Sequence, residues 1–344
     1  MKYLSLFSGI GGFELGIQQA YESNNEHAHI GEESQEEERS QGRERAADKH
    51  GVQLHGRDGT APLCIGYSEI DKYAIQIYEK HFKHTNYGDI TKLNPTDLPD
   101  FDLIVGGFPC QAFSIAGKRK GFDDTRGTLF FDIARIIKEK RPRYILLENV
   151  KGLLSHDTGR TFKTILSTLT ELGYDIQSMV LNAKNFGVPQ NRERVFIVGH
   201  IRGEPRPEVF PIGSDNTEDN RSVGKGLSNT LTGRSAGGKN WRGNYVQSNK
   251  SGLRQIRNLP NNPDSRGGQT HPASIRRLTP FECERLMGFP DGWTQYGLGE
   301  YDHRFGTKML TTISDTQRYK TLGNAVVTNV VQAVVEKLLT PTKT

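Results

Sequence analysis

Near its N-terminus the chain reads Tyr3-Leu4-Ser5-Leu6-Phe7-Ser8-Gly9-Ile10-Gly11-Gly12, a short apolar run followed by a glycine-rich loop. The apolar run predicts a strand, and the pattern after the loop predicts a helix that ends at about Tyr21. Glycines between a strand and a helix allow a ligand to approach the backbone at the N-terminus of the helix. Glu14 stands where the dinucleotide-binding fingerprint has its third glycine, so the loop departs from that fingerprint.

Short apolar runs alternate with helical patterns throughout residues 1–199. This alternation is typical of βαβ units and a parallel sheet, so the predicted fold class is α/β. Strands are expected at 63–68, 102–105, 144–147 and 195–198, and helices at 71–82, 131–140 and 162–172.

Two polar regions interrupt the alternation. Residues 22–62 contain ten acidic and five basic residues, a net charge of −5, and too few apolar side chains to form a packed core. We expect them to form a mobile acidic insertion. Residues 200–275 are rich in Gly, Asn, Ser, Pro and Arg and predict a loop-rich second domain. Helical patterns return at 279–288, where Thr279 and Glu282 predict a capping box, and at 324–339.

The composition excludes several classes of protein. The 344 residues contain no run of eighteen apolar residues, so no membrane-spanning helix is expected. The three cysteines, Cys64, Cys110 and Cys283, are scattered and match no zinc-binding or disulfide pattern, which favours a reducing compartment.

The basic side chains are unevenly distributed. Residues 220–263 contain eight basic residues and no acidic one, with Trp241 and Tyr245 among them. A basic stretch with aromatic side chains suits the phosphate backbone of a nucleic acid. A solvated surface is the alternative, but the complete absence of Asp and Glu favours nucleic acid.

Glu69 follows the second predicted strand and lies 60 residues after Gly9. Subtracting the 41 residues of 22–62 leaves 19, which is close to the spacing of about 20 residues at which an acidic side chain meets a ribose diol. The pair therefore points to a cofactor that contains adenosine. Alternatively, the Glu69 carboxylate only stabilises the N-terminus of the next helix. The spacing of Gly9 and Glu69 alone supports both interpretations equally.

Three further motifs carry reactive side chains near predicted strand ends. Cys110 follows a strand and a Gly-Gly pair, where a thiolate could act as a nucleophile; a small buried residue is the alternative. Glu148 comes at the end of a buried strand, where its carboxyl group could act as a general acid. Arg192 and Arg194 precede a strand and could bind a carbonyl or phosphate group, or form a surface charge pair instead.

Together, and in this order, these motifs resemble those of the DNA cytosine-5 methyltransferases, which use S-adenosylmethionine. The resemblance covers the chain except 22–62 and much of the basic region. Its two departures are Ser5, where many members have an acidic residue, and the insertion itself. The motifs that carry it begin at Phe7 (FSGIGG), Tyr67 (YSEID), Gly88 (GDI), Gly107 (GFPCQ), Arg126 (RGTL), Glu148 (ENV), Gln190 (QNRER), Arg277 (RLTPFECERLMGFP) and Gly323 (GNAV).

The resemblance implies four catalytic residues. Cys110 matches the nucleophile that attacks C6 of cytosine, and Glu148 matches the residue that bonds N3 and the exocyclic amine. Arg194 matches the arginine that holds O2 of the base, with Arg192 as a supporting contact. Because C6 cannot be reached inside a stacked duplex, the cytosine must be flipped out.

The resemblance also implies a pocket for S-adenosylmethionine, with S-adenosylhomocysteine as the product, and no metal. Ile70 matches the position that packs against the adenine, where a larger apolar residue can stand in relatives. The residues at cofactor-pocket positions are Phe7, Gly9, Gly11, Gly12, Glu69, Ile70, Asp89, Ile90, Pro109, Leu129, Asn324 and Val326.

In this family the basic region belongs to the domain that recognises the DNA target. We expect 1–199 to form the catalytic and cofactor-binding domain, 200–317 the target-recognition domain and hinge, and 318–344 a C-terminal helix that returns to the catalytic domain. The expected fold is a Rossmann-like class I methyltransferase sheet with helices on both faces, plus a smaller, loop-rich β domain. The predicted DNA-binding residues are Thr230, Arg234, Gly237, Gly238 and Arg242.

The predicted protein is a sequence-specific methyltransferase of double-stranded DNA that acts as a monomer, in a prokaryotic cytoplasm and a restriction–modification setting. An RNA cytosine methyltransferase on the same scaffold is the closest alternative, and the size of the basic region favours duplex DNA. The presence of Cys110, Glu148 and Arg194 argues against a DNA-binding protein without activity. The missing third glycine argues against a nicotinamide dehydrogenase.

Overall fold

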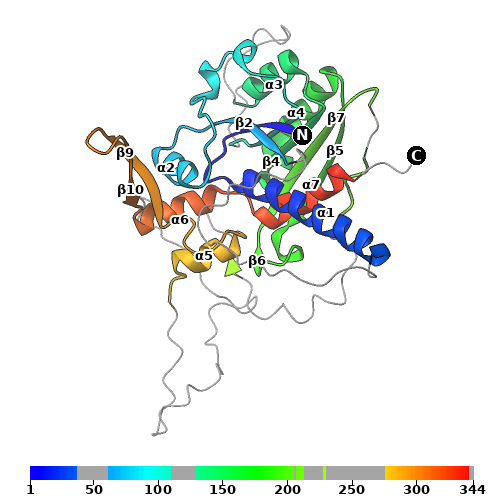
Figure 1. Ribbon diagram of the computed structural model, residues 1–344. Helices are drawn as coiled ribbons and strands as arrows, with labels where there is room; N and C mark the ends of the chain where they lie inside the picture. Colours follow the sequence, from blue (N-terminus) through cyan, green and yellow to red (C-terminus); the bar gives the residue numbers. More distant parts are fainter. Residues whose placement is uncertain (37–60, 110–128, 205–206, 213–227, 230–275, 341–344) are drawn as a thin grey trace.

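A six-stranded sheet forms the centre of the computed structural model, which describes residues 1–36, 61–109, 129–204, 207–212, 228–229 and 276–340 (Figure 1). The strand order is β2-β1-β3-β4-β7-β5. The strands are β1 (Lys2–Leu6), β2 (Leu63–Ser68), β3 (Leu103–Gly107), β4 (Tyr144–Val150), β5 (Tyr174–Asn182) and β7 (Glu193–Ile201).

One strand of the sheet runs against the others. β1 to β4 are parallel, whereas β7 is antiparallel to both β4 and β5. The parallel arrangement expected from the βαβ pattern is therefore found for β1 to β4 but not for β7. The link between β5 and β7, residues 183–192, is too short for a crossover, which needs a dozen or more residues. β5 was not predicted, because most of its residues are partly exposed and its apolar alternation is weak.

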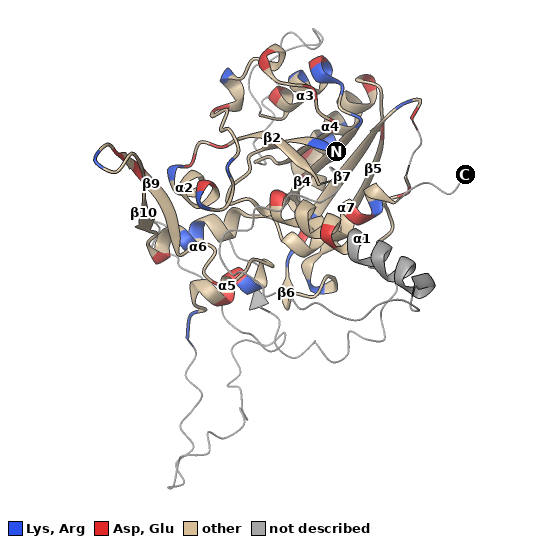
Figure 2. Ribbon diagram, viewed as in Figure 1, with Lys and Arg blue, Asp and Glu red and all other residues tan. Residues whose placement is uncertain are grey.

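Helices cover both faces of the sheet, and the observed fold confirms the predicted α/β class. α1 (Gly12–Glu36) and α7 (Thr328–Leu339) pack together on one face, and α3 (Leu129–Lys140) and α4 (Arg160–Glu171) lie on the other. Alternate strand residues enter two separate cores, as Val105 and Ile104 illustrate. In Figure 2 the ribbon segments coloured for charged residues lie mainly on the helices and loops around the sheet.

The remaining elements lie beside this sheet. α5 begins with the predicted capping box, in which Thr279 and Glu282 bond each other's backbone, so that prediction is confirmed. Asn324 was expected to begin the last helix but ends α6 instead, because Ala325 and Val327 adopt extended conformations that separate two helices. These elements are α2 (Lys72–His81), α5 (Pro280–Leu286), α6 (Asp315–Asn324), the hairpin β9 (Tyr296–Asp302) and β10 (Thr307–Thr312), and the short pair β6 (Gln190–Asn191) and β8 (Ser228–Asn229).

α1 is longer than predicted. It continues to Glu36 instead of ending at about Tyr21, so residues 22–36 of the expected insertion are helical. Glu and Gln favour helices, and this stretch contains no proline that would end one. Residues 37–60 of the expected insertion lie outside the described residues. In the part of the chain that the structure describes, no helix is long and apolar enough to cross a membrane.

Glu14 is a buried carboxyl group on α1, beneath the glycine loop. The Tyr78 hydroxyl donates to Glu14 Oε1 at 3.0 Å. Burial, which disfavours the charged form, raises the pKa of Glu14 to about 7, although bonds from Ser5 and Tyr78 oppose the rise. The folded protein therefore holds this proton at pH values where an unfolded chain has lost it.

Replacement of Glu14 by Gln should change how stability depends on pH. In the unfolded chain Glu14 ionises near its ordinary pKa of 4.5, but in the fold only near 7, so the stability that the neutral carboxyl contributes is lost as pH rises through 7. Relative to wild type, Glu14→Gln should gain on the order of 2–3 kcal/mol in unfolding free energy between pH 5 and pH 8. Urea denaturation at both pH values measures this gain. The control is Glu22→Gln, on the same helix but exposed, and an equal gain there would contradict the assignment.

Candidate active site at the carboxyl edge of the sheet

The loops that follow β1, β2, β3 and β4 meet at one edge of the sheet, because these strands are parallel. Ligands of open α/β sheets bind at such an edge. β7 is antiparallel and therefore begins at the edge where β4 ends, with Arg194 paired to Val150. This arrangement brings together side chains and loops from five strands.

The loop after β1 has a constrained backbone. Phe7, a non-glycine residue, has a φ of 54°, in the left-handed region that normally favours glycine. At Gly11, where φ is 88°, an added Cβ would lie 2.4 Å from the Phe82 ring. At Gly12 it would lie 2.8 Å from Val326 Cγ1, so two predicted cofactor positions 314 residues apart are in contact (326 − 12). Only glycine fits this close packing.

Glu69 fixes the same loop from the end of β2. Its Oε2 accepts the backbone N–H of Gly9 at 2.9 Å, and its Oε1 accepts those of Ile70 and Asp71, each at 2.8 Å. The N-cap of α2 is Asp71, whose carboxylate accepts from two N–H groups of the first turn. Glu69 therefore does not act as the cap of this helix, and its carboxylate lies against the glycine loop.

Other predicted cofactor positions differ in burial. The side chain of Asp89 accepts from the hydroxyl and the N–H of Thr91, and the hydroxyl bond is the main cause that lowers the pKa of Asp89. Ile90 is buried in the core, whereas Ile70 is 71% exposed beside Glu69. Pro109 and Asn324 are exposed, and Leu129 begins α3.

Glu148 and Arg194 form an ion pair of which little is exposed. Arg194 Nε lies 2.9 Å from Glu148 Oε1, and the two side chains are 16% and 12% exposed, respectively. Burial raises the pKa of Glu148, and the nearby charges of Arg194 and Arg192 oppose the rise. An added Cβ on Gly107 would lie 3.2 Å from Glu148 Oε2, so the carboxyl group packs against the end of β3.

Asn149 connects the same two strand ends and was given no role from sequence. Its side-chain amide donates to the Phe108 carbonyl at 2.9 Å, and its Oδ1 accepts the N–H of Val150 at 2.8 Å. Asn149 is buried. The signal in the sequence is a polar residue directly after an apolar strand, since such a residue needs a partner once buried.

Arg192, predicted as a supporting contact, bonds to backbone carbonyls at the end of α6. Its Nη2 donates to the carbonyls of Gly323 at 3.2 Å and Ala325 at 2.8 Å, on either side of Asn324. Burial lowers the pKa of Arg192 to about 9, so it remains charged at neutral pH. The guanidinium thus joins the start of β7 to the turn that follows α6.

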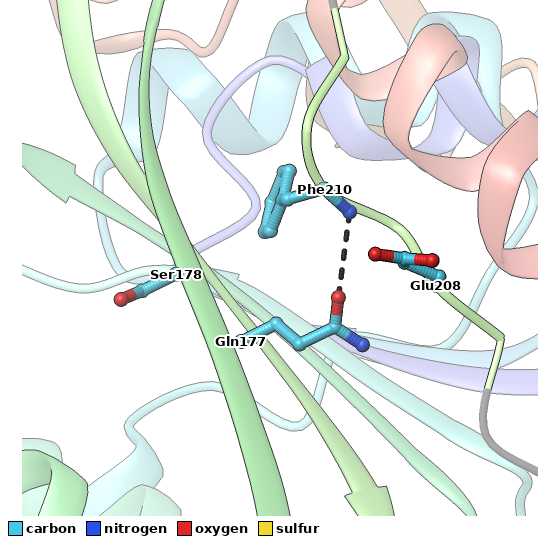
Figure 3. A pocket seen from close by; sticks show the side chains of 4 residues that line it. All are labelled: Gln177, Ser178, Glu208 and Phe210. Atoms are coloured by element: carbon cyan, nitrogen blue, oxygen red, sulfur yellow. Dashed lines mark hydrogen bonds between the residues drawn. The ribbon is translucent and has the colours of Figure 1, made fainter.

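The other predicted site residues lie outside the described residues: Cys110, Thr230, Arg234, Gly237, Gly238 and Arg242. A separate pocket lies where residues 208–210 cross β5; Gln177 Oε1 there accepts the Phe210 N–H at 3.4 Å (Figure 3). None of the predicted site residues that the structure describes lines this pocket. Within the described ranges, no group of His, Cys, Asp and Glu is suited to a metal ion.

Two solved structures have a similar fold. The S. pombe Dnmt2 methyltransferase matches with a TM-score of 0.60 and 18% sequence identity, over 98% of each chain. A putative DNA modification methyltransferase of an E. coli prophage matches with a TM-score of 0.53 and 19% identity, over 98% of each chain. The fold is therefore that of a methyltransferase.

Sequence comparison identifies the family. The C-5 cytosine-specific DNA methylase model matches residues 50–250 and 214–340. The chain is 42% identical over 305 residues to the Type II methyltransferase M1.ScrFI of Lactococcus lactis subsp. cremoris, covering 79% of this chain and 71% of the relative. It is 34% identical over 367 residues to M.NlaX of Neisseria lactamica, covering 98% and 96%, and 31% identical over 360 residues to M.HhaI of Haemophilus parahaemolyticus, covering 97% and 93%. The chain belongs to the C-5 cytosine-specific DNA methylase family, the DNA (cytosine-5-)-methyltransferases, as its motifs predicted.

Replacement of Arg194 by Met should destabilise the fold, because it leaves the Glu148 carboxylate buried without its cation. The expected loss is about 3 kcal/mol at pH 8. Without Arg194 the pKa of Glu148 rises further, so the carboxyl takes up a proton more readily at pH 5 than at pH 8, and the loss should be smaller at pH 5. Denaturation at both pH values measures the difference.

The matched control is Lys151→Met, which breaks an exposed pair with Glu193 and should cost no more than about 1 kcal/mol at either pH. Equal losses in the two variants would show that the Glu148–Arg194 pair behaves as a surface pair.

Proposed function

We propose that this chain methylates C5 of a cytosine that is flipped out of duplex DNA, through a covalent bond between Cys110 Sγ and C6. The observation that carries the proposal is the position of the Glu148 carboxyl group, which is bound to Arg194 and packed against Gly107, three residues before Cys110 (110 − 107). Glu148 therefore lies at the end of the strand next to β3, the strand that Cys110 follows in the sequence.

The proposed reaction begins with the Cys110 thiolate. Its sulfur forms a bond to C6, and the electron pair of the C5–C6 double bond moves to C5. C5 then takes the methyl group from the sulfonium of S-adenosylmethionine, which becomes S-adenosylhomocysteine. Loss of the C5 proton to solvent restores the double bond and expels the thiolate.

Glu148 and Arg194 would hold the base during this sequence. A carboxyl group with a raised pKa keeps its proton more readily, so Glu148 can donate to N3 as electron density builds on the ring. Arg194, which already donates to Glu148, would hold O2. Asn149 would fix the Phe108 peptide that leads to Cys110.

The residues at the glycine loop fit S-adenosylmethionine. The Glu69 carboxylate is held at the loop by three backbone N–H groups and can accept from a ribose hydroxyl. Ile70, next to it, presents an exposed apolar side chain suited to an adenine. Asp89 and Asn324 supply further polar groups, and Gly9, where an added Cβ would meet no described atom within 4 Å, leaves the backbone open to the ligand.

Target recognition is proposed for residues 200–317, in which the basic segment 220–263 would follow the DNA backbone. Residues 1–199 would form the catalytic domain, completed by residues 318–344. The Type II methyltransferases among the relatives support a restriction–modification setting and a specific target sequence.

Replacement of Cys110 by Ala should abolish methyl transfer and preserve DNA binding, because it removes only the attacking sulfur. Duplex DNA with 5-fluorocytosine should trap the wild type covalently, since fluorine cannot leave C5 as a proton does. Transfer of tritiated methyl groups measures the activity, both on DNA and on a tRNA transcript as a second substrate. Denaturing gels measure the covalent trapping. Cys64→Ala, which changes a buried cysteine, should still be trapped; turnover by Cys110→Ala would contradict the mechanism.

Replacement of Arg234 or Arg242 by Ala should weaken DNA binding. Loss of a base contact should weaken the binding free energy by about 1–3 kcal/mol and relax sequence specificity. Loss of a phosphate contact should instead weaken binding to all DNA sequences alike, and it should reduce the slope of log affinity against log salt concentration by roughly one. Binding titrations over a salt series separate these cases. Lys138→Ala, exposed near the end of α3, is the control; equal effects in all three variants would place the DNA surface elsewhere.

A further inference from the structure

Trp293 connects the C-terminal part of the chain to the glycine loop. It lies between α5 and β9, and it is buried. Its indole N–H donates to the carbonyl of Ile10 at 2.9 Å. Ile10 stands between Gly9 and Gly11, so this contact reaches the middle of the loop.

His81 holds the indole in place. Its ring stacks on Trp293 with a centroid distance of 3.6 Å and an angle of 3°. Burial lowers the pKa of His81 to about 4, so the ring is neutral at pH 7, and its Nε2–H donates to the Trp293 carbonyl at 2.8 Å. Phe289 and Phe82 pack against other parts of the indole.

A buried ion pair fixes the chain on both sides of Trp293. Glu284 accepts the N–H of Gly292 at 2.7 Å and that of Thr294 at 2.8 Å. Arg318 lies 3.2 Å from Glu284, and the side chains are 6% and 0% exposed. The backbone of Trp293 is therefore held between two anchored neighbours.

The glycine loop needs such support. The left-handed conformation of Phe7 is strained and persists only where the surroundings enforce it. Glu69 holds the Gly9 N–H, Phe82 closes the space at Gly11, and Trp293 holds the Ile10 carbonyl. Contacts from three separate parts of the chain thus fix the three consecutive residues Gly9, Ile10 and Gly11.

We infer that Trp293 is a positioning residue for cofactor binding: it holds the Ile10 peptide so that the backbone of Gly9 to Gly12 matches S-adenosylmethionine or S-adenosylhomocysteine. The inference rests on the proposed function of this loop. It predicts that an alteration of the indole changes cofactor affinity, and that cofactor binding changes the surroundings of the indole.

The first test leaves Trp293 unaltered. The chain contains two tryptophans, so Trp241→Phe leaves Trp293 as the only one. Titration of this variant with S-adenosylhomocysteine, without DNA, should give a saturable change in tryptophan emission whose midpoint equals the Kd from calorimetry. Trp293→Phe, which retains only Trp241, should give no saturable change.

The second test removes the donor. Trp293→Phe keeps an aromatic ring but loses the N–H, so its Kd for S-adenosylhomocysteine should rise about five- to tenfold. Its kcat at saturating S-adenosylmethionine should stay within about twofold of wild type. The control Trp241→Phe should keep the wild-type Kd. A purely structural role would lower the unfolding midpoint without a change in Kd.

The outcomes separate the two proposals. If wild type does not bind S-adenosylhomocysteine, the proposed function is wrong. If wild type binds it but Trp293 emission does not respond, the positioning role is wrong, and this measurement decides even if Trp293→Phe fails to fold. A folded Trp293→Phe variant with an unchanged Kd would also overturn the role.

Discussion

A buried carboxyl group needs a nearby cation if it is to keep any negative charge, and Glu148 satisfies this need through Arg194. The two can meet because β7 is antiparallel and begins where β4 ends. A crossover helix between β5 and β7 would have placed Arg194 at the opposite edge. The direction of β7 thus determines whether Glu148 and Arg194 lie in the same site.

The same edge is completed by residues from the far end of the chain. Val326 packs on Gly12, Arg192 bonds to the carbonyls around Asn324, and Trp293 bonds to Ile10. The packing of α7 on α1 brings these contacts into reach. The predicted cofactor positions Gly12 and Val326 are therefore distant in sequence but adjacent in space.

Sequence patterns correctly predicted the elements that depend on interactions between residues close together in the chain. The apolar runs of β1 to β4, the capping box at Thr279 and the glycine loop follow from short-range rules, and all were correctly located. The reversal of β7 and the length of α1 were not predicted, since one depends on the length of a connection and the other on helix propensity in a polar segment.

The roles of single side chains were harder to predict. The spacing from Gly9 indicated Glu69 but could not separate contact with the loop from capping of α2; the structure assigns the cap to Asp71. The long-range partners of Arg192, Asn149 and Trp293 leave no periodic signal, because each bonds to a backbone carbonyl that any residue type supplies.

The contact between Trp293 and Ile10 spans 283 residues, which has a consequence for synthesis. A ribosome adds about 5–20 residues per second, so Ile10 leaves the exit tunnel many seconds before its partner exists. Contacts between such distant residues also form late in folding, after a large loss of chain entropy. This loop is therefore made early but completed late, and the nascent chain passes through most of the synthesis of residues 10–293 without the contact that holds the Ile10 carbonyl.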